Sequence, residues 1–180
     1  MGLDEFLNSV PAEEGGQFTY ASLGELSALS VDDAGLLANE WEDWTDERMK
    51  NFLTRLTGLA EDDALLEFDT VFIAALESEH EDARSMAIRG LSECADRTLG
   101  ARFSKLLRKD EAITVREMAA RGLARFVEMA VERKLSTKEG ARIVAALEAS
   151  LSDPSEGEHV RLRALEAIAP VGGDTVTTRI

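Results

Sequence analysis

A block of nine residues occurs three times in this chain, and it constrains the fold more than any other feature of the sequence. The copies occupy residues 83–91, 115–123 and 160–168. Internal self-similarity of this kind is typical of repeat architectures, in which each unit buries its apolar face against its neighbours. The repeat therefore predicts how the chain is built, but not what it binds.

The three copies share one buried-face pattern. Each has an arginine at its second position. Counted from this arginine, the third residue is an alanine, the sixth is a small residue and the seventh is a large aliphatic residue. These offsets, with the position before the arginine, fall on one face of a helix with 3.6 residues per turn. Because the small residues let a neighbouring backbone approach closely, we expect this face to pack against the adjacent repeat. The aligned residues are Arg84, Arg116 and Arg161; Ala87, Ala119 and Ala164; Gly90, Gly122 and Ala167; and Leu91, Leu123 and Ile168.

The block resembles the second helix of a HEAT repeat, where a turn carrying aspartate leads into a helix that opens with valine and arginine. Asp110 precedes Arg116 by six residues, as in that pattern, and Asp153 precedes Arg161 across a longer turn. Ser78 stands where the first copy would have its aspartate. The resemblance covers residues 68–180. It implies a structural ladder of arginines and turn acids, consisting of Arg84, Asp110, Arg116, Asp153 and Arg161.

The fold class implied by this resemblance is all-α, a right-handed α-α superhelix of stacked antiparallel helix pairs. The order of the N-terminal segments also looks like that of small bacterial HEAT-repeat proteins. The 32-residue spacing between Arg84 and Arg116 is more similar to the HEAT-like repeats of bilin-lyase-type proteins. The family offers no catalytic residues that match positions in this chain.

Local signals divide the chain into an acidic leader with a capping helix, residues 1–44, and HEAT-like repeats over 45–180. We place the repeats at about 45–67, 68–95, 96–134 and 135–172, with another helix starting over 174–180 after Gly172 and Gly173. The predicted helix pairs are 69–78 with 81–94, 97–108 with 112–132, and 137–151 with 157–169. Ser30, Thr45 and Ser136 are predicted N-caps, the last in a capping box with Glu139.

The net charge of −15 argues against nucleic acid and anionic membranes as partners, because both repel an acidic surface. Residues 1–44 contain ten acidic side chains and no Lys or Arg. This asymmetry indicates either a basic protein partner or a device for solubility. No apolar run is long enough to span a membrane, the N-terminus lacks signal-peptide features, and Cys94 is the single cysteine. A cytoplasmic location is therefore expected.

Residue types that carry chemistry are few and do not form a known motif. His80 and His159 lie beside carboxylates, but they have no zinc-ligand spacing, so we expect solvated turn residues. Cys94 falls at an inward position and is expected to be a small core residue. No phosphate-binding loop or nucleophile elbow occurs. The sequence therefore predicts no enzyme activity, no metal and no cofactor.

Two surfaces remain as binding candidates. Trp41 and Trp44 form either a binding hot spot or, as we prefer, a cap on the first repeat. The solvent face of the second helices is the better candidate for contact with another protein. Its charges are mixed, so it is equally consistent with a solvated face on which Glu117 pairs with Arg121 and Arg125. The residues of this predicted stripe are Ser85, Arg89, Glu117, Arg121, Arg125, Leu162 and Glu166.

Two functions follow from these observations. The first is a non-enzymatic protein-interaction scaffold that binds through the surface of a HEAT-like solenoid. The alternative is a bilin-lyase-like module, or another small-ligand-handling repeat protein, which would need a pocket on its concave face.

Overall fold

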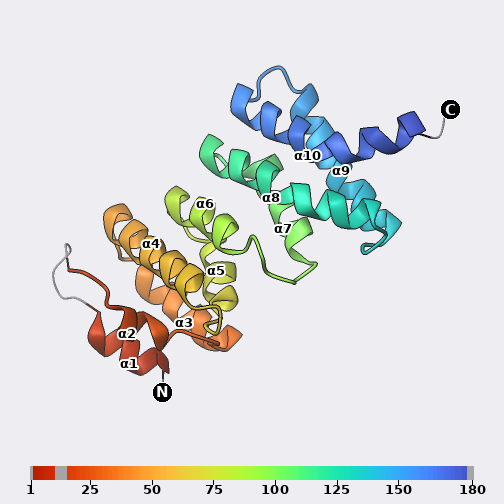
Figure 1. Ribbon diagram of the computed structural model, residues 1–180. Helices are drawn as coiled ribbons and strands as arrows, with labels where there is room; N and C mark the ends of the chain where they lie inside the picture. The colour runs from red at the N-terminus through yellow and green to blue at the C-terminus, as the bar shows by residue number, and fades with distance from the viewer. Residues whose placement is uncertain (1, 11–15, 178–180) are drawn as a thin grey trace. The chain divides into compact units, whose positions relative to one another are not determined.

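The computed structural model describes residues 2–10 and 16–177, with side chains as far as Val171. Within these residues the chain forms ten α-helices and no β-strand (Figure 1). It divides into two compact units, Met1–Cys94 and Ala95–Ile180. The all-α prediction is confirmed, and the division falls beside the predicted repeat boundary at residues 95 and 96. The predicted leader boundary at residue 44 lies inside the first unit.

The first unit contains α1 (Gly2–Ser9), α2 (Tyr20–Gly24), α3 (Val31–Trp41), α4 (Asp46–Asp62), α5 (Asp69–Ala75) and α6 (Glu81–Gly90). Helix α4 contacts α2 on one side and α6 on the other, while α3 contacts α5. The contact between α5 and α6 joins these two groups of helices.

Capping signals in the sequence locate the helix starts of this unit. The Ser30 hydroxyl accepts from the Asp33 amide at the start of α3, and the Thr45 hydroxyl accepts from the Arg48 amide at the start of α4. Both predicted caps are confirmed. The helix-periodic apolar residues of α4 are all buried: Met49, Phe52, Leu53, Leu56 and Leu59.

A cluster of aromatic rings attaches the N-terminal segments to α4. The Phe52 ring lies 5.3–6.0 Å, between centroids, from the rings of Phe6, Phe18, Trp41 and Trp44. Trp41 and Trp44 therefore pack on the first predicted repeat, residues 45–67, which agrees with the preferred interpretation of this pair as a cap. Two other apolar residues of residues 1–44, Tyr20 and Leu36, are more than half exposed.

The second unit contains α7 (Leu99–Lys109), α8 (Ile113–Val131), α9 (Thr137–Ser152) and α10 (Glu158–Thr177). Turns of three and five residues join α7 to α8 and α9 to α10, which makes each pair a helical hairpin. Helix α7 contacts α9, and α8 contacts α10. This unit therefore has two layers, with the first helices of the two pairs in one layer and the second helices in the other.

The repeated face is buried in both units, as predicted. Ala87, Ala119 and Ala164 have no exposed surface. Gly90 shows why a small residue is needed, because a β-carbon there would lie 2.6 Å from ring carbons of Phe72. Cys94 is buried at 7% exposure, which confirms its assignment to the core.

The chain departs from prediction near its C-terminus. Helix α10 continues through Pro170, Gly172 and Gly173 to Thr177, so no separate helix begins at Asp174. Residues 178–180, the rest of that predicted helix, lie outside the described residues. At Pro170 the helix lacks one backbone N–H donor, since proline has none. Among the described residues, no helix combines the length and apolarity needed to cross a membrane.

Candidate functional site

The first two repeat arginines make the same contacts with the turn that precedes them. Arg84 Nη1 donates to the carbonyl oxygens of Ser78 and Glu79, at 2.8 and 2.9 Å. Arg116 Nη1 donates to the carbonyls of Asp110 and Glu111 at the same two distances. Each guanidinium thus binds the carbonyls six and five residues before it and fixes the turn between the helices of a pair.

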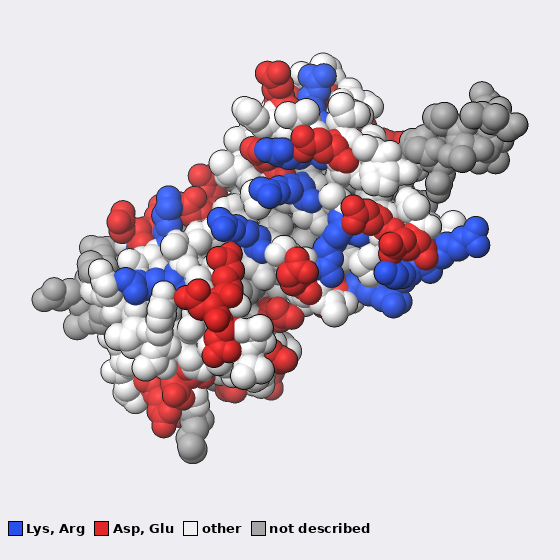
Figure 2. Space-filling model, viewed as in Figure 1, with Lys and Arg blue, Asp and Glu red and all other residues white. Residues whose placement is uncertain are grey.

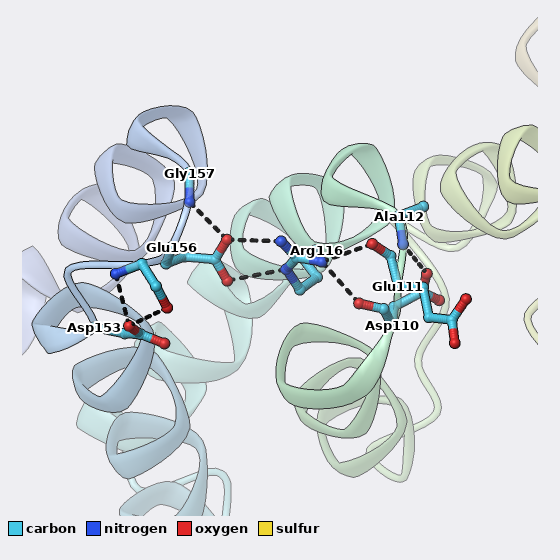
Figure 3. A network of polar contacts seen from close by, with 8 residues as sticks. Asp110, Glu111, Ala112, Arg116, Asp153, Glu156 and Gly157 are labelled. Carbon is cyan, nitrogen blue, oxygen red and sulfur yellow. Dashed lines mark hydrogen bonds and ion pairs between the residues drawn. The ribbon is translucent and has the colours of Figure 1, made fainter.

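Arg116 also joins its own hairpin to the next one. Its Nε and Nη2 donate to the two carboxylate oxygens of Glu156, each at 2.9 Å, and Glu156 also accepts from the Gly157 amide (Figure 3). Figure 3 shows the guanidinium between the two turns, with Glu156 on one side and Asp110 and Glu111 on the other. Glu156 is only 9% exposed and Arg116 20%, so this bidentate pair is largely shielded from water.

The pKa values of this pair follow from the contacts. Burial acts to raise the pKa of Glu156, but the hydrogen bonds from Arg116 and Gly157 outweigh it and leave the pKa below its usual value. The bond to Glu156 raises the pKa of Arg116. Both groups are therefore charged at neutral pH.

Arg116 has a further acid partner that the predicted ladder did not include, while the charge of the predicted Asp110 also acts on Arg116. Arg116 uses the backbone carbonyl of Asp110, and its carboxylate partner is Glu156. Asp110 Oδ1 instead accepts from the Ala112 amide. A signal for Glu156 is present in the sequence, because a glutamate stands five residues before each of the three arginines. These glutamates are Glu79, Glu111 and Glu156.

The third arginine of the predicted ladder lies apart from such a network. Arg161 is exposed, and its charge helps to lower the pKa of Asp153. The larger cause of that lowering is Ser155, whose hydroxyl and amide donate to Asp153 at 2.6 and 2.8 Å. Asp153 thus stabilises its own turn before α10.

Two residues of the predicted stripe are brought together by an arginine that the sequence analysis did not include. Arg163 on α10 lies 3.4 Å from Glu117 on α8 and 2.9 Å from Glu166. Hydrogen bonding to Glu166, followed by its charge and the bond to Glu117, raises the pKa of Arg163. Glu117 thus connects α8 to α10, a contact that was not considered when it was compared with Arg121 and Arg125 on its own helix.

The other stripe residues have separate environments. Arg89 lies 3.7 Å from Glu61 of α4, and the Ser85 hydroxyl donates to the Asp82 carbonyl within its own helix. The guanidinium of Arg125 lies over the Phe126 ring. Two residues of the second unit, Arg121 and Leu162, are exposed. The stripe is therefore split between contacts that hold helices together and a small exposed part.

Charge is divided unevenly between the units. The first has 22 Asp and Glu against 5 Lys and Arg, a net charge of −17, whereas the second has 13 against 15, a net charge of +2. Most of the Lys and Arg side chains visible in Figure 2 lie on the second unit. Helix α7 contains no acid and four bases, Arg102, Lys105, Arg108 and Lys109.

A groove of about 630 Å³ lies between α7 and α9, in the layer of first helices. Arginines line the groove from both helices. Arg108 is on α7, Arg97 is just before α7, and Arg142 is on α9. Glu139 is the one acid in its lining. The rest of the lining is mostly small or apolar, including Ala101, Ile143, Ala145, Ala146 and Ala149. This groove was not predicted from the sequence, where only the second helices were expected to offer a binding surface.

Neither histidine is part of a metal site. His80 is not the solvated residue expected, because its side chain is 14% exposed and Nδ1 lies 2.5 Å from Asp46 Oδ1 at the start of α4. His159 is exposed, as expected. In the described part of the chain, no three His, Cys, Asp or Glu side chains gather as a metal site would require.

No protein-family model matches this chain, and no curated protein or solved structure matches it either. The HEAT-like assignment therefore depends on the repeat pattern and on the arginine contacts described above.

Proposed function

We propose that this chain is a non-enzymatic protein-binding module of the HEAT-like type and that its second unit supplies the binding surface. The observation that carries the proposal is the α7–α9 groove. It combines small and apolar side chains with three arginines in one lining. Arginine with apolar surface is the composition favoured where proteins bind one another, and charged residues around a groove add specificity.

The repeat architecture supports this proposal. The arginine contacts of Arg84 and Arg116 recur with the same geometry, and the second unit has the two-layer arrangement of stacked hairpins. Stacked hairpins present extended surfaces that serve binding in solenoid proteins. A right-handed superhelix of stacked helix pairs and a cytoplasmic location are part of the same proposal. So is the exclusion of nucleic acid and membrane as partners, which follows from the net charge of −15.

The test is affinity capture with the full chain from extracts of its native cells, quantified by mass spectrometry. We compare the wild-type chain with an Arg108→Gln/Arg142→Gln variant and with Arg121→Gln, which removes one exposed charge outside the groove. The expected result is a set of proteins retained by the wild type and by Arg121→Gln but lost from the groove variant. Retention of no protein above a heat-unfolded control would refute the proposal.

One observation favours the small-ligand alternative. The groove volume lies in the range of small-molecule sites, roughly 300–1,000 Å³. The arginines would then select an anionic ligand. An absorbance scan and mass spectrum of the chain purified from native cells distinguish the two functions, since a bound chromophore or small anion would be carried through purification.

A further inference from the structure

We propose that the α7–α9 groove binds an acidic amphipathic helix of another protein. This inference rests on the proposed function, because it names the chemistry of the partner for the same groove.

The charge of the groove selects an anionic partner. The lining contains three guanidinium groups and one carboxylate, that of Glu139. This carboxylate is already engaged, because it accepts from the Ser136 hydroxyl and amide in the capping box of α9. These bonds lower the pKa of Glu139, with Arg97 and Arg142 contributing through their charges. Arg97 and Arg142 therefore act near the same end of the groove. A partner carboxylate placed there would receive charge-assisted hydrogen bonds.

The spacing of the lining fits a helix. Ala101, Ser104 and Arg108 follow one another at three and four residues, so they lie on one face of α7, with Arg97 just before the helix. The groove thus follows the eleven residues of α7, about 16 Å. Small side chains on its floor allow a third helix to approach closely. Arginines at both ends would then meet carboxylates about three helical turns apart on the partner.

A nucleic acid is disfavoured as the occupant of the groove, because the chain as a whole has a net charge of −15, which repels a long polyanion.

The experiment is a selection of phage-displayed random 18-residue peptides on the full-length chain. Selected peptides are synthesised with a fluorescent label and titrated by anisotropy against the wild type, Arg108→Gln/Arg142→Gln, Ala149→Phe and Arg121→Gln. Ala149→Phe fills the groove without changing charge, at an exposed position where folding is preserved. Far-UV circular dichroism verifies the fold of each variant. A labelled 20-nucleotide single-stranded DNA is titrated in parallel.

We expect the selected peptides to be enriched in Asp and Glu, with acids spaced at helical intervals beside apolar residues. Their Kd should rise at least tenfold for the double arginine variant and for Ala149→Phe, and change less than twofold for Arg121→Gln. Peptides that are basic, or whose affinity is insensitive to the groove variants, would overturn this inference while leaving protein binding by another surface intact. Failure to enrich any peptide would overturn the inference too. So would DNA binding that is tighter than peptide binding and is lost in the same variants.

Discussion

Removing Arg116 should destabilise the second unit more than the loss of an ordinary surface charge. The side chain donates to two carbonyls and forms a bidentate pair with Glu156, which is 9% exposed. Exposed pairs contribute about 0–1 kcal/mol, and breaking a fully buried pair costs about 3–5 kcal/mol. Because this pair lies between those limits, we expect Arg116→Ala to lower the free energy of unfolding by about 2 kcal/mol. Arg116→Lys should cost about half as much, since an ammonium cannot reproduce the planar fork.

The assay is urea denaturation followed by far-UV circular dichroism, with tryptophan fluorescence recorded on the same samples. Both tryptophans lie in the first unit, so fluorescence reports that unit while circular dichroism reports both. A double-mutant cycle of Arg116→Ala with Glu156→Gln should give a coupling energy of about 1 kcal/mol. Lys134→Ala is the control, because its pair with Glu132 is 61% and 55% exposed. Equal destabilisation by Arg116→Ala and Lys134→Ala would refute the reasoning.

The contribution of Glu156 also has a definite pH dependence. Its pKa in the folded chain lies below the usual 4.5, so the stabilisation is fully present above that value and is lost as the pH falls through the lowered folded pKa. The difference in unfolding free energy between the wild type and Glu156→Gln should therefore be constant from pH 7 to about 5 and shrink at lower pH. A difference that stays unchanged to pH 3 would contradict the assigned ion pair.

Three further perturbations test the packing. Gly90→Ala should destabilise the chain by about 1–3 kcal/mol in chemical denaturation, because the new methyl group would overlap the Phe72 ring. Gly58→Ala, which has open space around it, should stabilise the chain by about 0.5–1 kcal/mol. A stability change of the same sign for both variants would contradict the close approach at Gly90. Ala119→Arg, at a fully buried site, should lower the free energy of unfolding by more than about 3 kcal/mol. Thr114→Arg, at an exposed site, should lower it by well under about 1 kcal/mol. Equal melting temperatures of the two variants would mean that the helix faces are misassigned. Deleting residues 1–44 should cause aggregation in size-exclusion chromatography, because it removes the four rings that cover Phe52 and leaves this side chain of α4 exposed. A monomeric, stable 45–180 chain would refute that packing role.

Features encoded by neighbouring residues were predictable from the sequence. The capping hydroxyls of Ser30, Thr45 and Ser136 act within three residues, and all three helix starts are confirmed. The buried face of the repeat depends on a 3.6-residue period and is confirmed as well. Pro170 is the counterexample, since local rules favour a helix end there and α10 continues past it.

Features that depend on pairing between distant segments were not predicted. Glu156 reaches Arg116 from 40 residues away, and Arg163 reaches Glu117 from 46. The α7–α9 groove likewise requires two helices that are separated by all of α8. A periodic pattern gives the face on which a residue lies but not the partner on the adjacent helix, so the nearby Asp110 could be named for Arg116 whereas Glu156 could not.

Hydrogen–deuterium exchange of the full chain, with and without a peptide that it binds, tests the site assignment most directly. A bound helix would slow the exchange of the backbone amides beneath it by suppressing local opening. We predict added protection in residues 97–109 and 135–149, with little change in α8, α10 or the first unit. Protection confined to α8 and α10, or to the first unit, would contradict the assignment of the α7–α9 groove as the binding site.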